Sequence, residues 1–252
     1  MTLHSVSRWK AFLLHLALSA LIATTVIGLV VLLWYPRPYF TAMGGEVLLR
    51  LLIGVDVIVG PLITLIIFDT KKPRLKYDLA TIAVLQFAAL VYGGYVMFQA
   101  RPVYNVFVEN RFNAIAANGI DEQSRERAPA QYRDFSLTGP RVVAVRPPAE
   151  QSDQIRIATA AAMGGPEISE LPQYFVPYEE AAAKAARVSR PLVNLAQRDK
   201  ETADRVNQFV SEHAKQGQSL GYVPVKARNS DFAAVVDRNT GAIVGYLGVS
   251  PW

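Results

Sequence analysis

The chain has 252 residues, of which 51% are hydrophobic, and it contains no cysteine. The missing cysteines exclude disulfide frameworks, thiolate zinc sites and cysteine nucleophiles. Residues 1–100 carry 8 Lys/Arg against 4 Asp/Glu, and residues 101–252 carry 18 against 17, so most of the net charge of +5 lies in the first part. A nucleic-acid surface would need clustered basic residues in one domain, and we therefore expect no nucleic-acid partner.

Three apolar runs fill most of the first 100 residues, at positions 11–33, 47–68 and 79–98. A helix needs about 20 apolar residues to cross the hydrocarbon core of a bilayer. The sequence therefore predicts a membrane protein whose residues 1–100 form an anchor of three transmembrane helices. Residues 101–252 have the composition of a soluble domain.

Flanking charges predict the orientation of the anchor. The first run is longer than the apolar region of a cleavable signal and ends in Trp34-Tyr35-Pro36, which is typical of an uncleaved anchor with an interfacial aromatic belt. Cations gather before the first run and after the second: Arg8, Lys10, Lys71, Lys72, Arg74 and Lys76. Because cytoplasmic loops are rich in Lys and Arg, we expect a cytoplasmic amino terminus and a periplasmic carboxy-terminal domain, in a bacterial inner membrane.

Asp56 lies near the middle of the second run, and an ionisable residue in a membrane span indicates a functional site. Thr24, Thr25 and Tyr92 lie at a similar distance from the cytoplasmic ends of their own spans, about 18–21 Å at the helical rise. We expect these four residues to form an intramembrane polar contact if the helices pack together. Asp56 is then either a structural residue of the bundle or a contact for another protein's transmembrane helix. The surrounding Gly54-Val55-Asp56-Val57 lacks the Gly-x-Gly-Asp motif of an intramembrane protease.

The second part predicts an α+β domain with a small antiparallel sheet. Strands are expected at Val103–Val108 and Arg141–Val145, and a hairpin at Asp231–Val236 and Ala242–Leu247. Helices are expected at Glu150–Met163, Tyr178–Arg187 and Pro191–Lys215.

A segment rich in proline and tyrosine is the most unusual part of this domain. Prolines stiffen an extended path, and tyrosines on a rigid loop serve as recognition anchors. The candidate partner-binding residues are Gly164, Gly165, Pro166, Pro172, Tyr174, Pro177 and Tyr178. The alternative is that these residues pack the loop onto the domain's own core.

No motif indicates catalysis. The histidines, His4, His15 and His213, fall in three different regions, and neither a Gly-x-Ser-x-Gly elbow nor a phosphate-binding loop is present. We therefore predict no catalytic residue, no metal site and no cofactor.

A series of short motifs follows along the chain from residue 7 onward: Ser7-Arg8-Trp9-Lys10, Trp34-Tyr35-Pro36, Gly54-Val55-Asp56, Gly60-Pro61, Phe68-Asp69, Tyr77-Asp78-Leu79, Tyr92-Gly93, Arg101-Pro102-Val103-Tyr104 and Gly164-Gly165-Pro166. In these motifs and their order the chain resembles the type IV pilin accessory proteins, small inner-membrane proteins encoded beside major pilins. The resemblance covers nearly the whole chain and is densest over residues 7–112. It implies a chaperone-like role in pilus (fimbrium) biogenesis without catalysis, and it supplies no catalytic residues.

The expected function is thus that of a non-enzymatic accessory protein that binds and stabilises its cognate pilin or modulates its assembly. The expected partners are the major type IV pilin, inner-membrane pilus assembly proteins and membrane lipid. The alternative is a membrane-anchored envelope enzyme or pilin-modifying factor, which predicts a pocket of convergent acids or histidines in residues 101–252.

Overall fold

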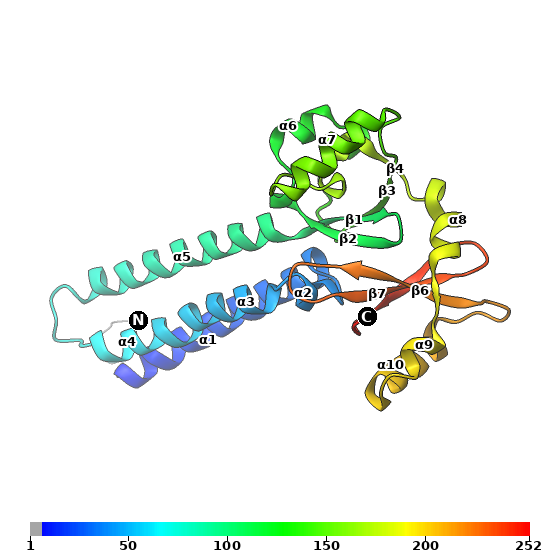
Figure 1. Ribbon diagram of the computed structural model, residues 1–252. Helices are drawn as coiled ribbons and strands as arrows, with labels where there is room; N and C mark the ends of the chain where they lie inside the picture. The colour runs from blue at the N-terminus through cyan, green and yellow to red at the C-terminus, as the bar shows by residue number, and fades with distance from the viewer. Residues whose placement is uncertain (1–6) are drawn as a thin grey trace. The chain divides into compact units, whose positions relative to one another are not determined.

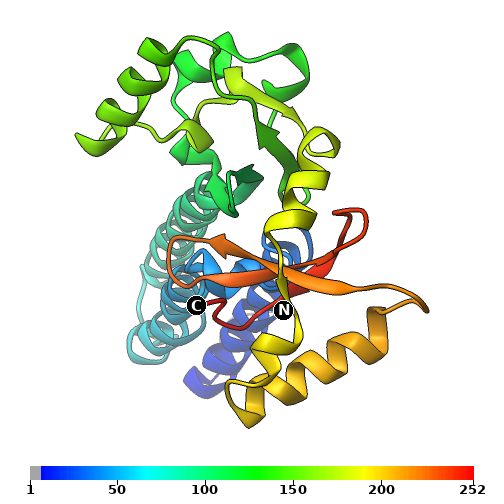
Figure 2. The ribbon, with the colours of Figure 1, turned by 45° about the vertical axis from the view of Figure 1, so that its right-hand side comes forward.

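The computed structural model describes residues 7–252 and divides the chain into two compact units. One unit contains the chain up to Leu33 together with Gly45–Gln99. The other contains Ala100–Trp252 and, in addition, the short segment Trp34–Gly44. Figures 1 and 2 show the helices and strands of each unit.

The first unit consists of helices. Helix α1 (Arg8–Leu29) continues into the π-helical turn η2 (Val30–Trp34). The second run is α3 (Gly45–Ile53), η3 (Gly54–Val59, π-helical) and α4 (Gly60–Ile67), and the third is α5 (Leu75–Ala100). Within the described residues these runs of 27, 23 and 26 residues are the helices long and apolar enough to cross a membrane.

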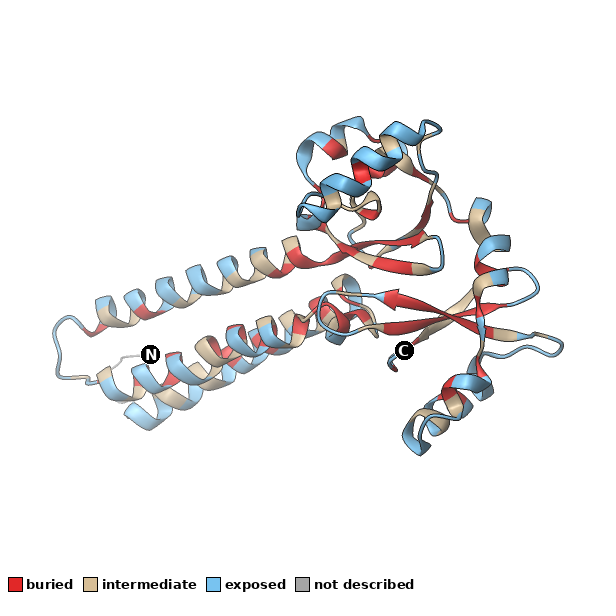
Figure 3. Ribbon diagram, in the orientation of Figure 1, coloured by how far each residue is buried: buried red, intermediate tan, exposed pale blue. Residues whose placement is uncertain are grey.

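Most of the surface of these helices is both apolar and open. Helix α1 packs along η3 and α4, yet side chains such as Leu14, Leu32 and Ile66 are more than 70% exposed. In α5 only 6% of the most apolar stretch is buried, and Figure 3 shows most of the helix as exposed or intermediate. Large exposed apolar patches mark surfaces that lipid or another protein covers.

The second unit is built on one mixed sheet of eight strands within the described residues. Its strand order is β4-β3-β1-β2-β6-β7-β8, and β5 pairs with β6 beside this path. The strands are β1 (Pro102–Val108), β2 (Arg111–Ala116), β3 (Arg141–Val145), β4 (Phe175–Pro177), β5 (Arg190–Pro191), β6 (Leu220–Lys226), β7 (Phe232–Asp237) and β8 (Ile243–Leu247). The pairs β1–β3 and β2–β6 are parallel. The expectation of a small antiparallel sheet is therefore wrong, because the two parallel pairs join distant segments into a larger sheet.

Two hydrophobic cores lie along this sheet. One gathers around β1 and β3 and includes Tyr104, Tyr132 and Phe175. Nearby helices are α6 (Glu122–Arg127), α7 (Gln151–Ala162) and the short turns η4 (Ala117–Gly119), η5 (Ala130–Tyr132), η6 (Ile168–Glu170) and η7 (Pro172–Tyr174). The other core gathers around β6–β8 and is covered by α9 (Val193–Ala196) and α10 (Lys200–His213), while α8 (Glu179–Val188) contacts β4, β6 and β7.

The segment Trp34–Gly44 is built into the second unit. Its helix α2 (Tyr39–Ala42) places the Tyr39 ring edge-on against Phe232 and Tyr246, with ring centroids 5.0 and 5.4 Å away. The carbonyl of Ala42 accepts a hydrogen bond of 2.8 Å from the backbone N–H of Asn229 in the β6–β7 turn. The loop between the first two apolar runs is thus part of the sheet domain's core.

Several expected elements are present, and others differ. The strands at β1 and β3, the β7–β8 hairpin and the helices α7 and α8 lie where the sequence predicts them. The expected helix Pro191–Lys215 is broken, because Arg190–Pro191 pairs as β5 and the Asp199 side chain starts α10 by accepting from the N–H of Thr202. Strands β2, β4 and β6 were not expected.

Candidate functional site

The second apolar run changes its helical register around Asp56. Within η3 the N–H of Gly60 donates to the carbonyl of Val55, five residues earlier. In this register the carbonyl of Asp56 would accept from residue 61, which is Pro61 and has no N–H. The shifted register and Pro61 together leave this carbonyl without a donor in its own helix.

Gln86 of α5 supplies the missing donor. Its side-chain Nε2 donates to the backbone carbonyl of Asp56 over 3.1 Å. The absence of a side chain at Gly60 makes room for this contact, because a Cβ there would lie 1.9 Å from the same nitrogen. Away from water such freed backbone groups must be satisfied by neighbouring helices. Gln86 and Gly60 together join α5 to the π-helical turn.

The carboxylate of Asp56 is buried and incompletely satisfied. The residue is 7% exposed, and its Oδ1 has no hydrogen-bond partner in the part of the chain that the structure describes. Asp56 lines a cavity of about 300 Å³, whose other lining residues are His15, Leu18, Ser19, Ile22, Ala83, Gln86, Phe87 and Leu90. His15 Nδ1 lies 2.7 Å from the hydroxyl of Thr64, which places a second polar pair beside the cavity. A buried acceptor without a donor indicates a site that a ligand or partner group can complete.

The other three residues of the expected intramembrane contact lie elsewhere. The hydroxyls of Thr24 and Thr25 donate to carbonyls of their own helix, Ala20 and Leu21, and both residues are exposed. Tyr92 is 71% exposed. The expectation that these residues surround Asp56 is therefore wrong, because equal depth does not place side chains on the same helix face.

The sequence reasoning missed the residues that do accompany Asp56. Ser19, His15 and Gln86 are polar residues inside apolar runs, so their positions were visible in the sequence. The signal was the polarity of each residue together with its helical phase, and depth alone could not supply the phase.

The proline- and tyrosine-rich segment serves largely as core. Tyr178 is buried, and its hydroxyl donates to the carbonyl of Gly241 over 2.6 Å. Pro172 is buried, Tyr174 is half-buried, and Pro177 is exposed in β4. Tyr178 and Pro172 therefore follow the alternative that the loop packs onto its own domain.

Besides Pro177, three residues of this segment that follow helix α7 remain on the surface. Gly164, Gly165 and Pro166 are exposed, and Gly164 has the positive φ of +88° that ends helix α7. In Gly165 a Cβ would lie 2.9 Å from the carbonyl oxygen of Ala160, so this glycine permits the close turn. Both glycines thus have a structural reason to be present.

Metal ligation has no support in the described residues, which contain no group of three or more His, Asp or Glu side chains that could hold an ion. His4 lies outside the residues that the structure describes.

The fold and the site define a class of protein: an amino-terminal unit of three bilayer-length apolar helices with a buried polar cluster, followed by a mixed-sheet domain. Comparison with known proteins makes this class specific. Residues 4–44 match the family described as fimbrial assembly protein FimB. No solved structure matches the chain.

Three relatives come from Dichelobacter nodosus. The fimbrial assembly protein of serogroup I is 29% identical over 231 residues, which cover 90% of this chain and 89% of the relative. The protein of serogroup E1 is 27% identical over the same shares of both chains. The protein of serogroups C1 and C2 is 41% identical over 97 residues, which cover 37% of this chain and 73% of the relative. The chain belongs to the fimbrial assembly protein family, and the family resemblance expected from its motifs is confirmed.

Proposed function

We propose that this chain is a non-enzymatic accessory protein of type IV pilus biogenesis, which binds its cognate pilin in the bacterial inner membrane and stabilises it before assembly. The relatives named as fimbrial assembly proteins support the role in pilus biogenesis. The three apolar helices support a location in a membrane.

The proposed topology follows from the flanking charges. The cations at Arg8 and Lys10 and in the loop from Lys71 to Lys76 are cytoplasmic, so three crossings leave the sheet domain in the periplasm. In this topology the apolar helices are available to another membrane protein within the same bilayer.

The observation that carries the proposal is the unsatisfied carboxylate of Asp56. A buried acceptor left without a donor costs about 1–3 kcal/mol, and more for a charged group. A partner helix that places a donor at this depth would recover that free energy on binding. The cavity that Asp56 lines with Phe87 and Leu90 is mostly apolar around it, as a helix-binding surface in a bilayer requires.

The opposing hypothesis of an envelope enzyme would use convergent acids in the sheet domain. Glu167 and Glu170 do lie together, but Glu170 Oε2 accepts from the N–H of Glu167 over 2.8 Å, and Glu167 pairs with Lys226 over 3.4 Å. These contacts give both carboxylates a structural role and favour the non-enzymatic proposal.

The test is to replace Asp56 by Ala and by Asn, with Asp69→Asn as the matched control. Asp69 is an exposed carboxylate at the end of the same run, and an asparagine there can still accept from the N–H of Lys71. We expect both Asp56 variants to lose surface pili while the level of the accessory protein stays normal. Normal piliation at normal protein level would remove Asp56 from the mechanism. Loss of the accessory protein itself would assign Asp56 to the structure of the helical unit.

A further inference from the structure

Strand β2 has a second neighbour along only part of its length. It pairs with β1 from Arg111 to Ala116, but it pairs with β6 only at Phe112 and Asn113. From Ala114 to Ala116 the edge facing away from β1 has no strand beside it in the described part of the chain. An open edge of this kind is a template for another extended chain.

The segment Trp34–Gly44 explains why β6 leaves β2. Beyond Lys226 the chain turns, with the N–H of Ala227 donating to Asp231 Oδ1 over 2.9 Å. The turn is then fixed by the bond from the N–H of Asn229 to the carbonyl of Ala42. These contacts hold the chain after β6 away from the remainder of β2.

The backbone N–H of Ala116 faces the open edge. The N–H of Ala117 donates to the carbonyl of Arg101 over 3.0 Å, on the β1 side. Because successive N–H groups of a strand point to opposite edges, the N–H of Ala116 points away from β1. The pairing of β2 with β6 ends at Asn113, and no turn or loop bond of the Ala116 N–H is found within residues 7–252.

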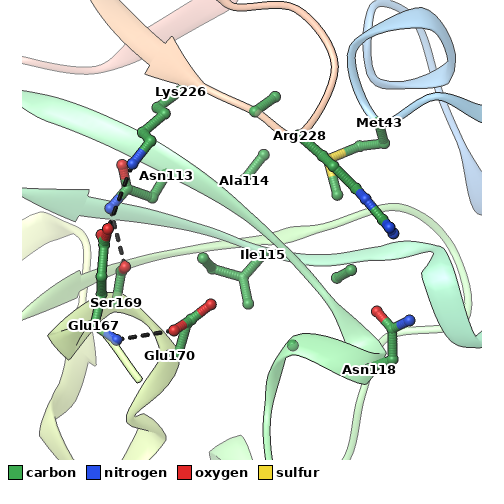
Figure 4. A pocket seen from close by; sticks show the side chains of 13 residues that line it. Met43, Asn113, Ala114, Ile115, Asn118, Glu167, Ser169, Glu170, Lys226 and Arg228 are labelled. Carbon is green, nitrogen blue, oxygen red and sulfur yellow. Dashed lines mark hydrogen bonds and ion pairs between the residues drawn. The ribbon is translucent and has the colours of Figure 1, made fainter. Parts of the chain in front are cut away.

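A pocket of about 310 Å³ lies beside this edge (Figure 4). Its floor is the β2 stretch Asn113–Ala116, and Met43, Asn118, Glu170 and Arg228 lie around it. Ala114 and Ala116 are half-exposed and have small side chains, so they leave room for a chain laid against the strand.

The charges around the pocket favour an acidic ligand. Glu167 pairs with Lys226, and Glu170 accepts a hydrogen bond from the backbone N–H of Glu167. Arg228 is exposed and lines the pocket, and no ion pair of its guanidinium is found among the described residues. A cation left at the end of an open edge is complementary to a carboxylate.

We propose that this pocket binds an extended, acidic segment of a partner protein, which adds as a strand beside Ala114–Ala116 and pairs its carboxylate with Arg228. Main-chain hydrogen bonds to the edge supply affinity in such strand addition, and flanking side chains supply specificity. A helical ligand would leave the Ala116 N–H without an acceptor, which favours a strand. The proposal goes beyond the intramembrane contact at Asp56 and does not depend on it.

The test uses the purified full chain in a neutral detergent and a fluorescent eight-residue peptide of alternating Val and Thr with one Asp, measured by anisotropy. We expect saturable binding that weakens about tenfold in Arg228→Glu, because a charge-assisted hydrogen bond is lost. The matched control is Arg187→Glu, which reverses the charge of an exposed arginine on α8 and should leave binding unchanged. A peptide methylated on alternate backbone nitrogens should bind the parent chain at least as weakly as the unmethylated peptide binds Arg228→Glu.

The variant Ala116→Pro tests the backbone contact in the folded protein. Ala116 has φ of −80°, which proline adopts, so the substitution removes the N–H without straining the strand. We expect it to weaken peptide binding while thermal unfolding of the chain stays unchanged. The proposal is overturned if no saturable binding occurs up to about 1 mM peptide. It is also overturned if backbone methylation has no effect, or if Arg187→Glu weakens binding as much as Arg228→Glu.

Discussion

Replacing Tyr39 tests whether the segment Trp34–Gly44 is a structural part of the sheet domain. The Tyr39 side chain is 1% exposed and packs edge-on against two aromatic rings, Phe232 and Tyr246. Truncating a buried aromatic side chain to alanine costs about 3–5 kcal/mol through lost burial and the cavity left behind. Since domains are stable by about 5–15 kcal/mol, we expect Tyr39→Ala to remove a large share of the domain's stability.

Two matched variants separate the ring from its hydroxyl and from its neighbours. Tyr39→Phe keeps the buried ring and removes only its hydroxyl, which lies beside Tyr246, so it should change the stability by about 1 kcal/mol at most. Phe40→Ala removes a half-buried aromatic ring from the same helix, α2, and should cost less than Tyr39→Ala.

The assay is urea unfolding of the purified chain in detergent, followed by near-ultraviolet circular dichroism of the sheet domain. Hydrogen exchange of the Asn229 amide, which donates to Ala42, reports in parallel whether the segment stays docked. The reasoning is refuted if Tyr39→Ala costs less than about 1 kcal/mol, the effect of an ordinary substitution. It is also refuted if that amide exchanges equally slowly in Tyr39→Ala and in the parent chain.

Three further predictions concern other buried polar groups. Burial raises the pKa of Tyr104 to about 12, so the folded protein keeps a proton that the unfolded chain releases near pH 10. The contribution of Tyr104 to the free energy of unfolding should therefore be fully present below pH 10 and be lost between about pH 10 and 12. A free energy of unfolding that stays constant across that window would contradict this. Tyr178→Phe should cost about 1–3 kcal/mol in urea unfolding, because the buried carbonyl of Gly241 loses its donor, and an unchanged midpoint would show that this bond contributes nothing. Gln86→Leu should destabilise the helical unit by about 1 kcal/mol and shorten the lifetime of the chain in membranes, because the carbonyl of Asp56 loses its donor; an unaltered lifetime would contradict that role.

The helical unit was predictable because one simple constraint controls it. A run of about 20 apolar residues is long enough for a span, and the three runs were located within a few residues. The surroundings of Asp56 were not predictable from depth, because the face of each helix matters as much as its height. Gly60 and Pro61 did indicate a local irregularity, but the π-helical turn and its donor Gln86 needed the third helix in place.

The sheet domain was harder to predict because its key pairings join distant segments. The β7–β8 hairpin is local and was found, whereas β2 and β6 are separated by more than 100 residues and pair in parallel. Because proline cannot donate to a strand ladder, Pro224 predicts from the sequence that no strand forms here, yet the β6–β7 pairing includes it. Local patterns carry no information about such long-range register.

The segment after the first apolar run shows the same limit. Trp34-Tyr35-Pro36 has the composition of an interfacial aromatic belt, but Tyr35 is completely buried within the sheet-domain unit. Burial in a core and partition into a membrane interface select similar aromatic residues, so composition cannot separate them. Tyr178 is buried instead of exposed for a related reason, because tyrosine serves both as a core residue and as a recognition anchor.

Co-purification of pilin with this chain tests the central proposal most directly. Membranes of cells that produce pilin and the tagged chain are solubilised in a mild detergent, and the ratio of pilin to chain is measured for the parent, Asp56→Asn and Asp69→Asn. We predict a ratio that falls about tenfold in Asp56→Asn alone, since an asparagine replaces an acceptor oxygen by a donor amide at the unsatisfied site. An equal ratio in all three chains, or an equal loss in both variants, would contradict the assignment of pilin binding to Asp56.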